Sequence, residues 1–395
     1  MVFDTDARTF RGADVLTAGG RVAGIALGIA APAGARVVDA SGWYILPGLI
    51  DCHVHLTARG DPSDINDMAA GPIAIRAWRA EQNAIATLRA GFTTVRDLGA
   101  ADHLNIHLAN ATANGLVRGP KILAAGFGVT MTGGHGHGFI AREADGPDEV
   151  RKAVREQLRA GAGTIKLFAS GGVMTPGVDP RSPSFTEEEL RAGVEEAHKA
   201  YRVVAAHAQA VDGIKNAIRA GVDSIEHGVW LDDEGVSLML ERGTCMVPTL
   251  TAPFLIAHGG LDAGIPPYMV AKGHQVLEDH VASYKRALKA GVKVAMGTDQ
   301  GTPLSRPGEN AQEIVRMGEH GLSPAAAILA ATSWAATLLR IEDDRGALRE
   351  GLAADVVAFA ADPLEDLKVL TNDNDIRVVM KDGIVVRGPR DEEEG

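Results

Sequence analysis

Eight short apolar runs occur along the middle of this chain, and longer segments with helical spacing separate them. This alternation is the sequence pattern of repeated strand–helix units, which build parallel sheets. Eight units predict an α/β fold with a closed (β/α)8 TIM barrel, because an open doubly wound sheet usually has fewer strands. No GxGxxG follows the first run, which weakens the dinucleotide-binding alternative. The runs are 44–56, 93–98, 121–129, 164–169, 203–208, 224–227, 245–250 and 293–297.

The segments between the runs carry apolar residues at helical spacing, and many of them end near a glycine. Glycine is the residue that most often terminates a helix. These segments predict helices at 148–160, 187–200, 213–220, 232–242, 281–290, 311–319 and 324–339.

Both ends of the chain have a different character, with short strand patterns in place of long helical segments. Two strand-rich ends that flank a different middle make most sense if they pair with each other. We therefore predict a small β-sandwich domain built from residues 1–46 and 345–390, beside a barrel that spans residues 47–344.

Charge and composition restrict the classes of partner. The formal net charge of −12 provides no basic field for nucleic acid or for an anionic membrane surface. Two cysteines, Cys52 and Cys245, fit a reducing compartment, and no apolar run reaches the roughly 20 residues of a membrane span. The start of the chain has no signal-peptide pattern. We expect a cytoplasmic protein that acts on a small molecule, with a homo-oligomer as an allowed state.

Metal-binding side chains occur where the predicted strands end. His53 and His55 end the first run two residues apart, so both point to the same face of that strand. Two imidazoles placed in this way can share one cation. His207 and His227 lie at the ends of the fifth and sixth runs, and Asp299 follows the end of the eighth. Each alone would fit a core histidine or a helix-capping aspartate, but their shared position predicts a metal site at the mouth of the barrel.

A lysine, Lys166, interrupts the fourth run between Ile165 and Leu167. An unpaired ammonium group in a buried strand is costly, so this lysine is either paired in the core or kept neutral. A neutral lysine can react with carbon dioxide to give a carbamate, whose two oxygens can bridge two divalent cations. Lys166 therefore extends the prediction from one metal ion to two.

The same residues form motifs that resemble those of the amidohydrolase superfamily over nearly the whole chain. Within it, the sequence most resembles the imidazolonepropionase-like and prolidase-like (Xaa-Pro dipeptidase-like) enzymes, which cleave amide bonds of dipeptides and N-acyl amino acids. The motifs are GLIDCHVHL at 48–56, the buried Lys166, AH at 206–207, IEHG at 225–228, GTD at 297–299 and GLAAD at 351–355.

The resemblance implies a binuclear site, with zinc as the expected metal. His53, His55 and Asp299 would hold the more buried ion, His207 and His227 the outer ion, and a carbamate on Lys166 would bridge them. A water between two cations loses its proton near neutral pH and becomes a nucleophile. Asp299 would accept that proton and pass it to the leaving amine, which makes Asp299 both ligand and catalytic residue.

Two glycine-rich loops are candidates for substrate binding. The TGGH motif at 132–135 matches one in prolidase-like enzymes, whose histidine contacts the substrate, so the resemblance makes His135 a catalytic and substrate-binding candidate. His137 follows in the same loop. After the fourth run, the backbone of Gly171 and Gly172 could bind a substrate carboxylate. Gln209 stands where many prolidase-like relatives have a tyrosine, which puts dipeptidase activity in doubt.

Two other functions are compatible with the pattern. A mononuclear deaminase or imidazolone-type cyclic-amide hydrolase would use the same barrel with one metal ion, but such relatives lack the bridging lysine. An inactive barrel that serves as a binding or assembly protein would be expected to lose ligands, and all six are present here. We predict a metal-dependent hydrolase of a carbon–nitrogen bond.

Overall fold

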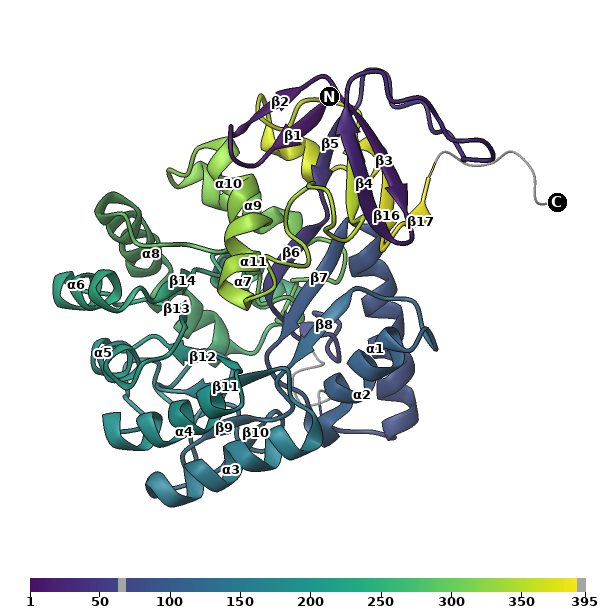
Figure 1. The fold of residues 1–395 in the computed structure, drawn as a ribbon. Helices are drawn as coiled ribbons and strands as arrows, with labels where there is room; N and C mark the ends of the chain where they lie inside the picture. Colours follow the sequence, from purple (N-terminus) through teal and green to yellow (C-terminus); the bar gives the residue numbers. More distant parts are fainter. Residues whose placement is uncertain (63–68, 389–395) are drawn as a thin grey trace.

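The computed structural model of the protein describes residues 1–62 and 69–388. The chain has a mixed α/β fold in which parallel strands lie at the centre, helices lie outside them, and further strands gather at one end (Figure 1). In this described part, no helix is both long enough and apolar enough to cross a lipid bilayer.

Two parallel sheets contain the strands from the middle of the chain. The first consists of β6 (Leu49–Val54), β7 (Phe92–Asp97) and β8 (Lys121–Ala124), in that order. The second has the order β10-β9-β11-β12-β13-β14, where the strands are β9 (Gly128–Thr130), β10 (Ala141–Glu143), β11 (Thr164–Phe168), β12 (Val203–Ala208), β13 (Ser224–His227) and β14 (Cys245–Val247).

Backbone hydrogen bonds join the edges of these two sheets. On one side, the Gly163 amide, just before β11, donates to the Ala124 carbonyl of β8 at 2.8 Å. On the other side, the segment 293–300 lies between β14 and β6. Met246 donates to the Lys293 carbonyl at 2.8 Å, and Cys52 donates to the Met296 carbonyl at 2.9 Å.

Helices follow the strands and form the outer layer. Helices α3 (Gly146–Ala160), α4 (Glu187–Lys199), α5 (Val211–Ala220) and α6 (Asp233–Arg242) lie on the outer side of β9 to β13 (Figure 1). Thr186 starts α4 in a capping box with Glu189. The other α-helices of the described chain are α1 (Ile73–Arg89), α2 (Leu104–Ala113), α7 (Thr251–Gly259), α8 (Pro267–Ala290), α9 (Ala311–Glu319), α10 (Pro324–Ala330) and α11 (Ser333–Leu339).

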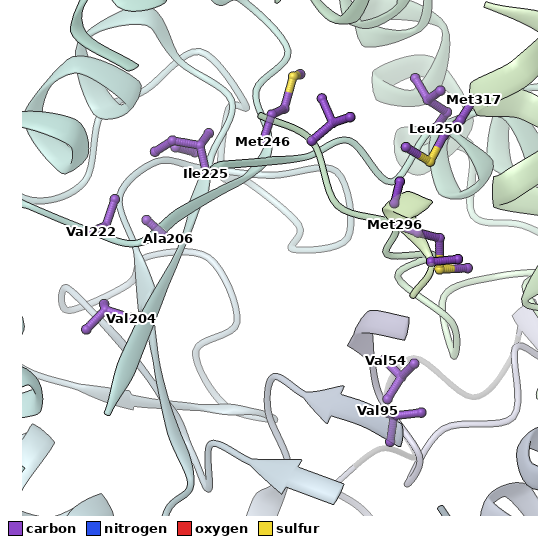
Figure 2. Packing of buried hydrophobic residues seen from close by; sticks show 14 of the residues in the cluster. Val54, Val95, Val204, Ala206, Val222, Ile225, Met246, Leu250, Met296 and Met317 are labelled. Atoms are coloured by element: carbon purple, nitrogen blue, oxygen red, sulfur yellow. The ribbon is translucent and has the colours of Figure 1, made fainter. Parts of the chain in front are cut away.

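The central strands are buried on both faces. Along each strand, apolar side chains that face the helices alternate with side chains that face the interior, some of which are polar. Val204 and Ala206 of β12 belong to the large hydrophobic cluster that also contains residues of the surrounding helices (Figure 2). Because successive side chains point to opposite faces, His207 lies on the inner side. On β11, the side chain of Lys166 points to the face opposite that of Ile165, and Ile165 belongs to the same hydrophobic cluster. The two-residue period therefore directs polar side chains of neighbouring strands into one interior.

The two ends of the chain pair in one six-stranded sheet. Strand β5 (Tyr44–Pro47) is antiparallel to β15 (Val356–Phe359), and the sheet order is β17-β16-β15-β5-β1-β2. Arg345 donates to Asp355 at 2.8 Å and to Asp382 at 3.2 Å, which ties the C-terminal segment to this sheet. The remaining strands are β1 (Val2–Asp4), β2 (Thr9–Arg11), β16 (Ile376–Lys381), β17 (Ile384–Arg387) and the hairpin of β3 (Asp14–Ala18) with β4 (Arg21–Ala26).

The structure corrects four of the predicted elements. The run 44–56 is not one strand, because β5 and β6 belong to different sheets and Gly48 lies between them. The run 121–129 likewise divides into β8 and β9. The run 293–297 is not a regular strand, since only Val294 forms an isolated bridge there, to Met246. The helix predicted at 324–339 breaks at Thr332, whose φ of −139° and ψ of −100° are not helical, and gives α10 and α11.

Gly48 allows a close approach between the terminal sheet and the parallel sheet that contains β6. A Cβ atom at this position would lie 2.2 Å from the Thr93 Oγ1 and 2.8 Å from the Asp355 Cβ. Its amide donates to the Asp355 carbonyl at 2.9 Å. The absence of a side chain is therefore what lets the chain pass from the terminal sheet into β6.

We predict that Gly48→Ala destabilises the protein by about 1–3 kcal/mol, because overpacking forces the buried neighbours to move. Thermal unfolding should show a clear decrease in Tm. Gly12→Ala is the matched control, since a Cβ there has no heavy atom within 4 Å. Equal Tm values for the two variants would contradict this explanation.

Candidate metal centre

The structure brings three of the predicted ligands into one cluster. Within the described chain, His53, His55 and Asp299 have ligand atoms that all lie within 4.8 Å of one another. The Asp299 Oδ1 lies 3.3 Å from the His53 Nε2 and 3.2 Å from the His55 Nε2. Both histidines are buried, with exposed fractions of 1% and 6%. This geometry fits a single divalent cation with two nitrogen ligands and one oxygen ligand.

A buried aspartate fixes the backbone around this cluster. Asp51, on β6, accepts hydrogen bonds from the Thr298 amide and hydroxyl at 3.1 and 2.7 Å and from the Asn310 side chain at 2.8 Å. The Asp299 amide in turn donates to the His53 carbonyl at 2.8 Å. Asp51 therefore holds the segment that carries Asp299 against the strand that carries His53 and His55.

Two further imidazoles lie beside the cluster, on neighbouring strands. The rings of His207 on β12 and His227 on β13 are 4.5 Å apart between centroids, and the His227 ring is 5.3 Å from that of His53. Lys166, on β11, is buried with 1% exposure, and its Nζ lies 5.4 Å from the centroid of the Phe168 ring. All six predicted ligands line the same cavity.

Each of the four imidazoles uses one nitrogen for a hydrogen bond to a group outside the six predicted ligands. The second nitrogens of His53 and His55 face Asp299. The Nδ1 atoms of His53, His55 and His227 bond to Glu226 at 2.8 Å, to the Gly99 carbonyl at 3.1 Å and to the Thr249 hydroxyl at 2.6 Å. His207 instead uses its Nε2, which bonds to the Gly171 carbonyl at 2.9 Å. Metal-binding histidines characteristically have such partners, which fix ring orientation and tautomer, so the residues present fit a bound cation.

The electrostatic surroundings favour the metal-binding protonation states of His53, His207 and Asp299, but not that of His55. Burial, followed by Lys166, lowers the pKa of His207 to about 3 and that of His53 well below its usual value. The pKa of His55 is raised, since Asp299 outweighs the effect of burial. Burial lowers the pKa of Lys166 to about 8. Burial acts to raise the pKa of Asp299, but His53 and His55 outweigh it and lower that pKa. Neutral imidazole and ionised carboxylate are the forms that bind metal ions.

Three residues at the site have left-handed backbone conformations: His227 with φ of 69°, Thr249 with φ of 52° and Asp299 with φ of 58°. Such conformations cost of order 1–3 kcal/mol for residues other than glycine, and they persist only where surrounding contacts hold them. Here the Thr249–His227 and Asp299–His53 hydrogen bonds provide those contacts. The left-handed backbone conformation therefore sets the direction of the His227 and Asp299 side chains.

Sequence reasoning assigned no role to two fully buried charged residues, Arg96 and Glu226. Arg96 Nη2 donates to the Glu226 Oε1 at 2.9 Å, and the Glu226 Oε2 accepts from His53. Arg96 also donates to the Cys52 carbonyl at 2.6 Å. The sequence does contain a signal for this pair. Arg96 lies in one predicted buried strand and Glu226 in another, and opposite charges buried in this way have to be paired.

The predicted substrate-binding residues lie in different settings. His135 lines the cavity, 4.6 Å from the His207 ring between centroids, and its Nδ1 bonds to the Thr175 hydroxyl at 2.8 Å. Gln209 also lines the cavity. His137 does not line it and bonds to the Gly134 carbonyl at 2.7 Å.

The loop after β11 touches the site through its glycines. The Gly171 amide donates to the Ser182 carbonyl at 2.8 Å, and the Gly171 carbonyl accepts from His207. A Cβ at Gly172 would lie 2.5 Å from the His135 Nε2. Neither glycine is among the residues that line the cavity. The loop therefore packs directly against two histidines of the site.

Comparison with known proteins identifies the family of the chain. The model of the amidohydrolase family matches residues 44–386, which is most of the chain. The chain belongs to the amidohydrolase family. It is accordingly a hydrolase that acts on carbon–nitrogen bonds, and the resemblance predicted from the sequence motifs is confirmed.

Individual relatives match over most of their length. Ochratoxinase of Aspergillus niger is 35% identical over 382 residues, covering 87% of this chain and 76% of the relative. A crystal structure of a Xaa-Pro dipeptidase with methionine bound in its active site is 34% identical, with a TM-score of 0.88 over 98% of both chains. A prolidase complexed with N-methylphosphonate-L-proline is 33% identical, with a TM-score of 0.90 over 98% of both chains.

A buried glutamate anchors the wall of the cavity. Glu313, on α9, accepts from the amides of Leu250 and Thr251 and from the Thr251 hydroxyl at 2.8, 2.8 and 2.6 Å. These groups lie at the start of α7, whose residue Ile256 lines the cavity. Burial raises the pKa of Glu313 from 4.5 to about 7. The folded state therefore binds a proton at Glu313 between these pH values, whereas the unfolded state does not.

We predict that Glu313 makes the protein less stable as the pH rises from 4.5 through 7, because protons bound only by the folded state are then lost. In Glu313→Gln this dependence is absent. The unfolding free energy of the wild type minus that of the variant should be more positive at pH 5 than at pH 8, by on the order of 2 kcal/mol. Denaturant unfolding at both pH values measures it, with the exposed Glu319→Gln on the same helix as control. A difference that stays constant with pH would contradict the raised pKa.

Proposed function

We propose that this protein is a binuclear metal-dependent hydrolase that cleaves the amide bond of an N-acyl amino acid, a dipeptide or a related carboxamide. The observation that carries the proposal is the convergence of four imidazoles, Lys166 and Asp299 on one buried cavity. The likeness to a Xaa-Pro dipeptidase with bound methionine supports a substrate that contains an amino acid.

The ligand assignment follows the two groupings in the structure. His53, His55 and Asp299 would hold one cation, because their ligand atoms form the compact cluster. His207 and His227 would hold the second, since their rings lie together beside that cluster. Lys166 lies on β11, the strand next to β12, and as a carbamate it would be a ligand shared by the two ions. Zinc is the proposed metal, because imidazole and carboxylate ligands suit it.

The chemistry divides between the ions and the protein. When bound, two cations would supply a deprotonated water as nucleophile and polarise the scissile carbonyl. The Asp299 carboxylate would take up a proton and deliver it to the nitrogen of the leaving amine. His135 lines the cavity and its Nδ1 bonds to the Thr175 hydroxyl, and it would donate a hydrogen bond to the carbonyl oxygen as negative charge develops.

A mononuclear deaminase or cyclic-amide hydrolase is the second candidate. The compact His53–His55–Asp299 cluster alone would suffice for one cation. The number of metal ions bound per chain distinguishes the two functions.

We further propose that the two parallel sheets, joined at Gly163 and at 293–300, form a closed (β/α)8 barrel over residues 47–344. Residues 1–46 and 345–390 would form the β-sandwich domain, of which residues 389 and 390 lie outside the described chain. The acidic charge and the two unpaired cysteines, Cys52 and Cys245, support a small-molecule substrate and a cytoplasmic location.

We predict that Lys166→Met lowers the zinc content from two ions per chain to one, because the bridging ligand is lost while His53, His55 and Asp299 remain. Hydrolytic activity should fall below detection. Elemental analysis of protein expressed with bicarbonate measures the metal content. Lys199→Met, at the C-terminal end of α4, is the control. One ion in the wild type, with ammonia released from a heterocyclic substrate, would instead support the mononuclear function.

We predict that Asp299→Asn lowers kcat far more than it lowers metal content, since the amide cannot accept the proton. The expected loss in kcat is about 10²–10⁴-fold. Steady-state kinetics and elemental analysis on the same preparation test both parts. Near-normal turnover in Asp299→Asn would overturn the role assigned to this residue.

A further inference from the structure

The loop that follows β11 contacts His135 at both nitrogens of its ring. The Thr175 hydroxyl bonds to the His135 Nδ1 at 2.8 Å and accepts from the Gly136 amide at 3.0 Å. At the other nitrogen, a Cβ on Gly172 would lie 2.5 Å from the Nε2, so the Gly172 backbone packs directly against that part of the ring. The position of His135 in the cavity wall therefore depends on where Gly172 and Thr175 lie.

This loop has no regular secondary structure of its own. Residues 171–182 form no helix and no strand. No backbone amide of the described chain donates to the carbonyl oxygens of Gly172, Thr175 or Val178. Gly172 and Thr175 are buried, and a buried carbonyl group requires a hydrogen-bond donor. The donor therefore has to come from a neighbouring element.

The ammonium group of Lys272, on α8, is that donor. Its Nζ donates to the carbonyl oxygens of Gly172, Thr175 and Val178 at 3.2, 2.7 and 2.5 Å. All three N–H groups of the ammonium are used in this way. Hydrogen bonds from a charged donor are stronger than those between neutral groups. Two of the three acceptors belong to the residues that contact His135.

We propose that Lys272 is a positioning residue that fixes the loop after β11 and thereby aligns His135 with the carbonyl oxygen of the bound substrate. This inference rests on the proposed function, in which His135 stabilises the negative charge on that oxygen. Lys272 does not itself line the cavity, so its charge acts on the loop and not on the substrate. A donor of this kind is most effective when it is held in place before the reaction begins.

The proposed metal ligands have a separate support. The Gly171 carbonyl accepts from His207, and the Gly171 amide donates to the Ser182 carbonyl. Among the hydrogen bonds of the described chain, those of Lys272 reach neither Gly171 nor any of the six proposed ligands. Loss of the ammonium group should therefore displace His135 and leave the metal ions in place.

The first test removes the ammonium group and retains a long side chain. In zinc-loaded Lys272→Met, kcat should fall by about tenfold to a hundredfold, as for a small misplacement of a catalytic group. KM and zinc content should stay close to those of the wild type. Lys272→Arg, which retains a charged donor, should restore part of the loss. Lys289→Met, at an exposed position on the same helix, is the control. An unchanged kcat, or a loss of zinc in parallel with kcat, would overturn the proposal.

A double-mutant cycle separates positioning from general support of the site. Kinetics are measured on the fastest of three substrates, N-acetyl-methionine, alanyl-methionine and alanyl-proline. When His135→Ala is already present, Lys272→Met should have little further effect on kcat, because the group to be aligned is absent. Effects of the two substitutions that multiply, to within the about twofold scatter of independent sites, would overturn the proposal. If Lys272→Met does not fold, Lys272→Gln, a neutral donor, takes its place in the cycle.

Hydrogen–deuterium exchange distinguishes failure of this inference from failure of the proposed function. If the zinc-loaded protein hydrolyses none of the three substrates, the proposed function fails, and exchange still tests the role of Lys272. In Lys272→Met, the amides of residues 172–178 and that of Gly136 should exchange faster than in the wild type, because local opening becomes easier. The amides of α1 should be unaffected. Unchanged exchange in the loop and at Gly136 would overturn the inference.

Discussion

The candidate metal centre depends on a buried ion pair between Arg96 and Glu226. Both side chains are fully buried, so each needs the other to offset the loss of hydration. The pair also joins strands, because Arg96 reaches from β7 to the Cys52 carbonyl on β6 and to Ser224 on β13. The second carboxylate oxygen of Glu226 then orients His53. One interaction thus links the register of three strands to the direction of the first proposed ligand.

Much of this arrangement could be predicted because strand periodicity is a local property of the sequence. The two-residue alternation fixes which side chains share a face, so it places His53 with His55, and Lys166 opposite Ile165. The repeated position of polar residues at strand ends then predicts that they meet. The structure shows all six of these residues around one cavity.

Other features depend on contacts between distant parts of the chain, which local patterns do not record. Gly48 separates two strands because of Thr93 and Asp355, neither of which is near it in sequence. His280 is one of several histidines in helical segments, and only the packing of α8 places it in the cavity wall. The segment around Val294 follows a strand pattern but makes only one bridge there. Its hydrogen bonds are nevertheless sufficient to connect β14 with β6.

The filling of the interior has a consequence for proton exchange at the first proposed ligand. Arg96, Glu226 and Ser224 have no solvent exposure, and Glu226 bonds to the Nδ1 of His53. Solvent therefore has no direct access to that nitrogen through these side chains. A proton held there can exchange with water only when the surrounding structure opens locally.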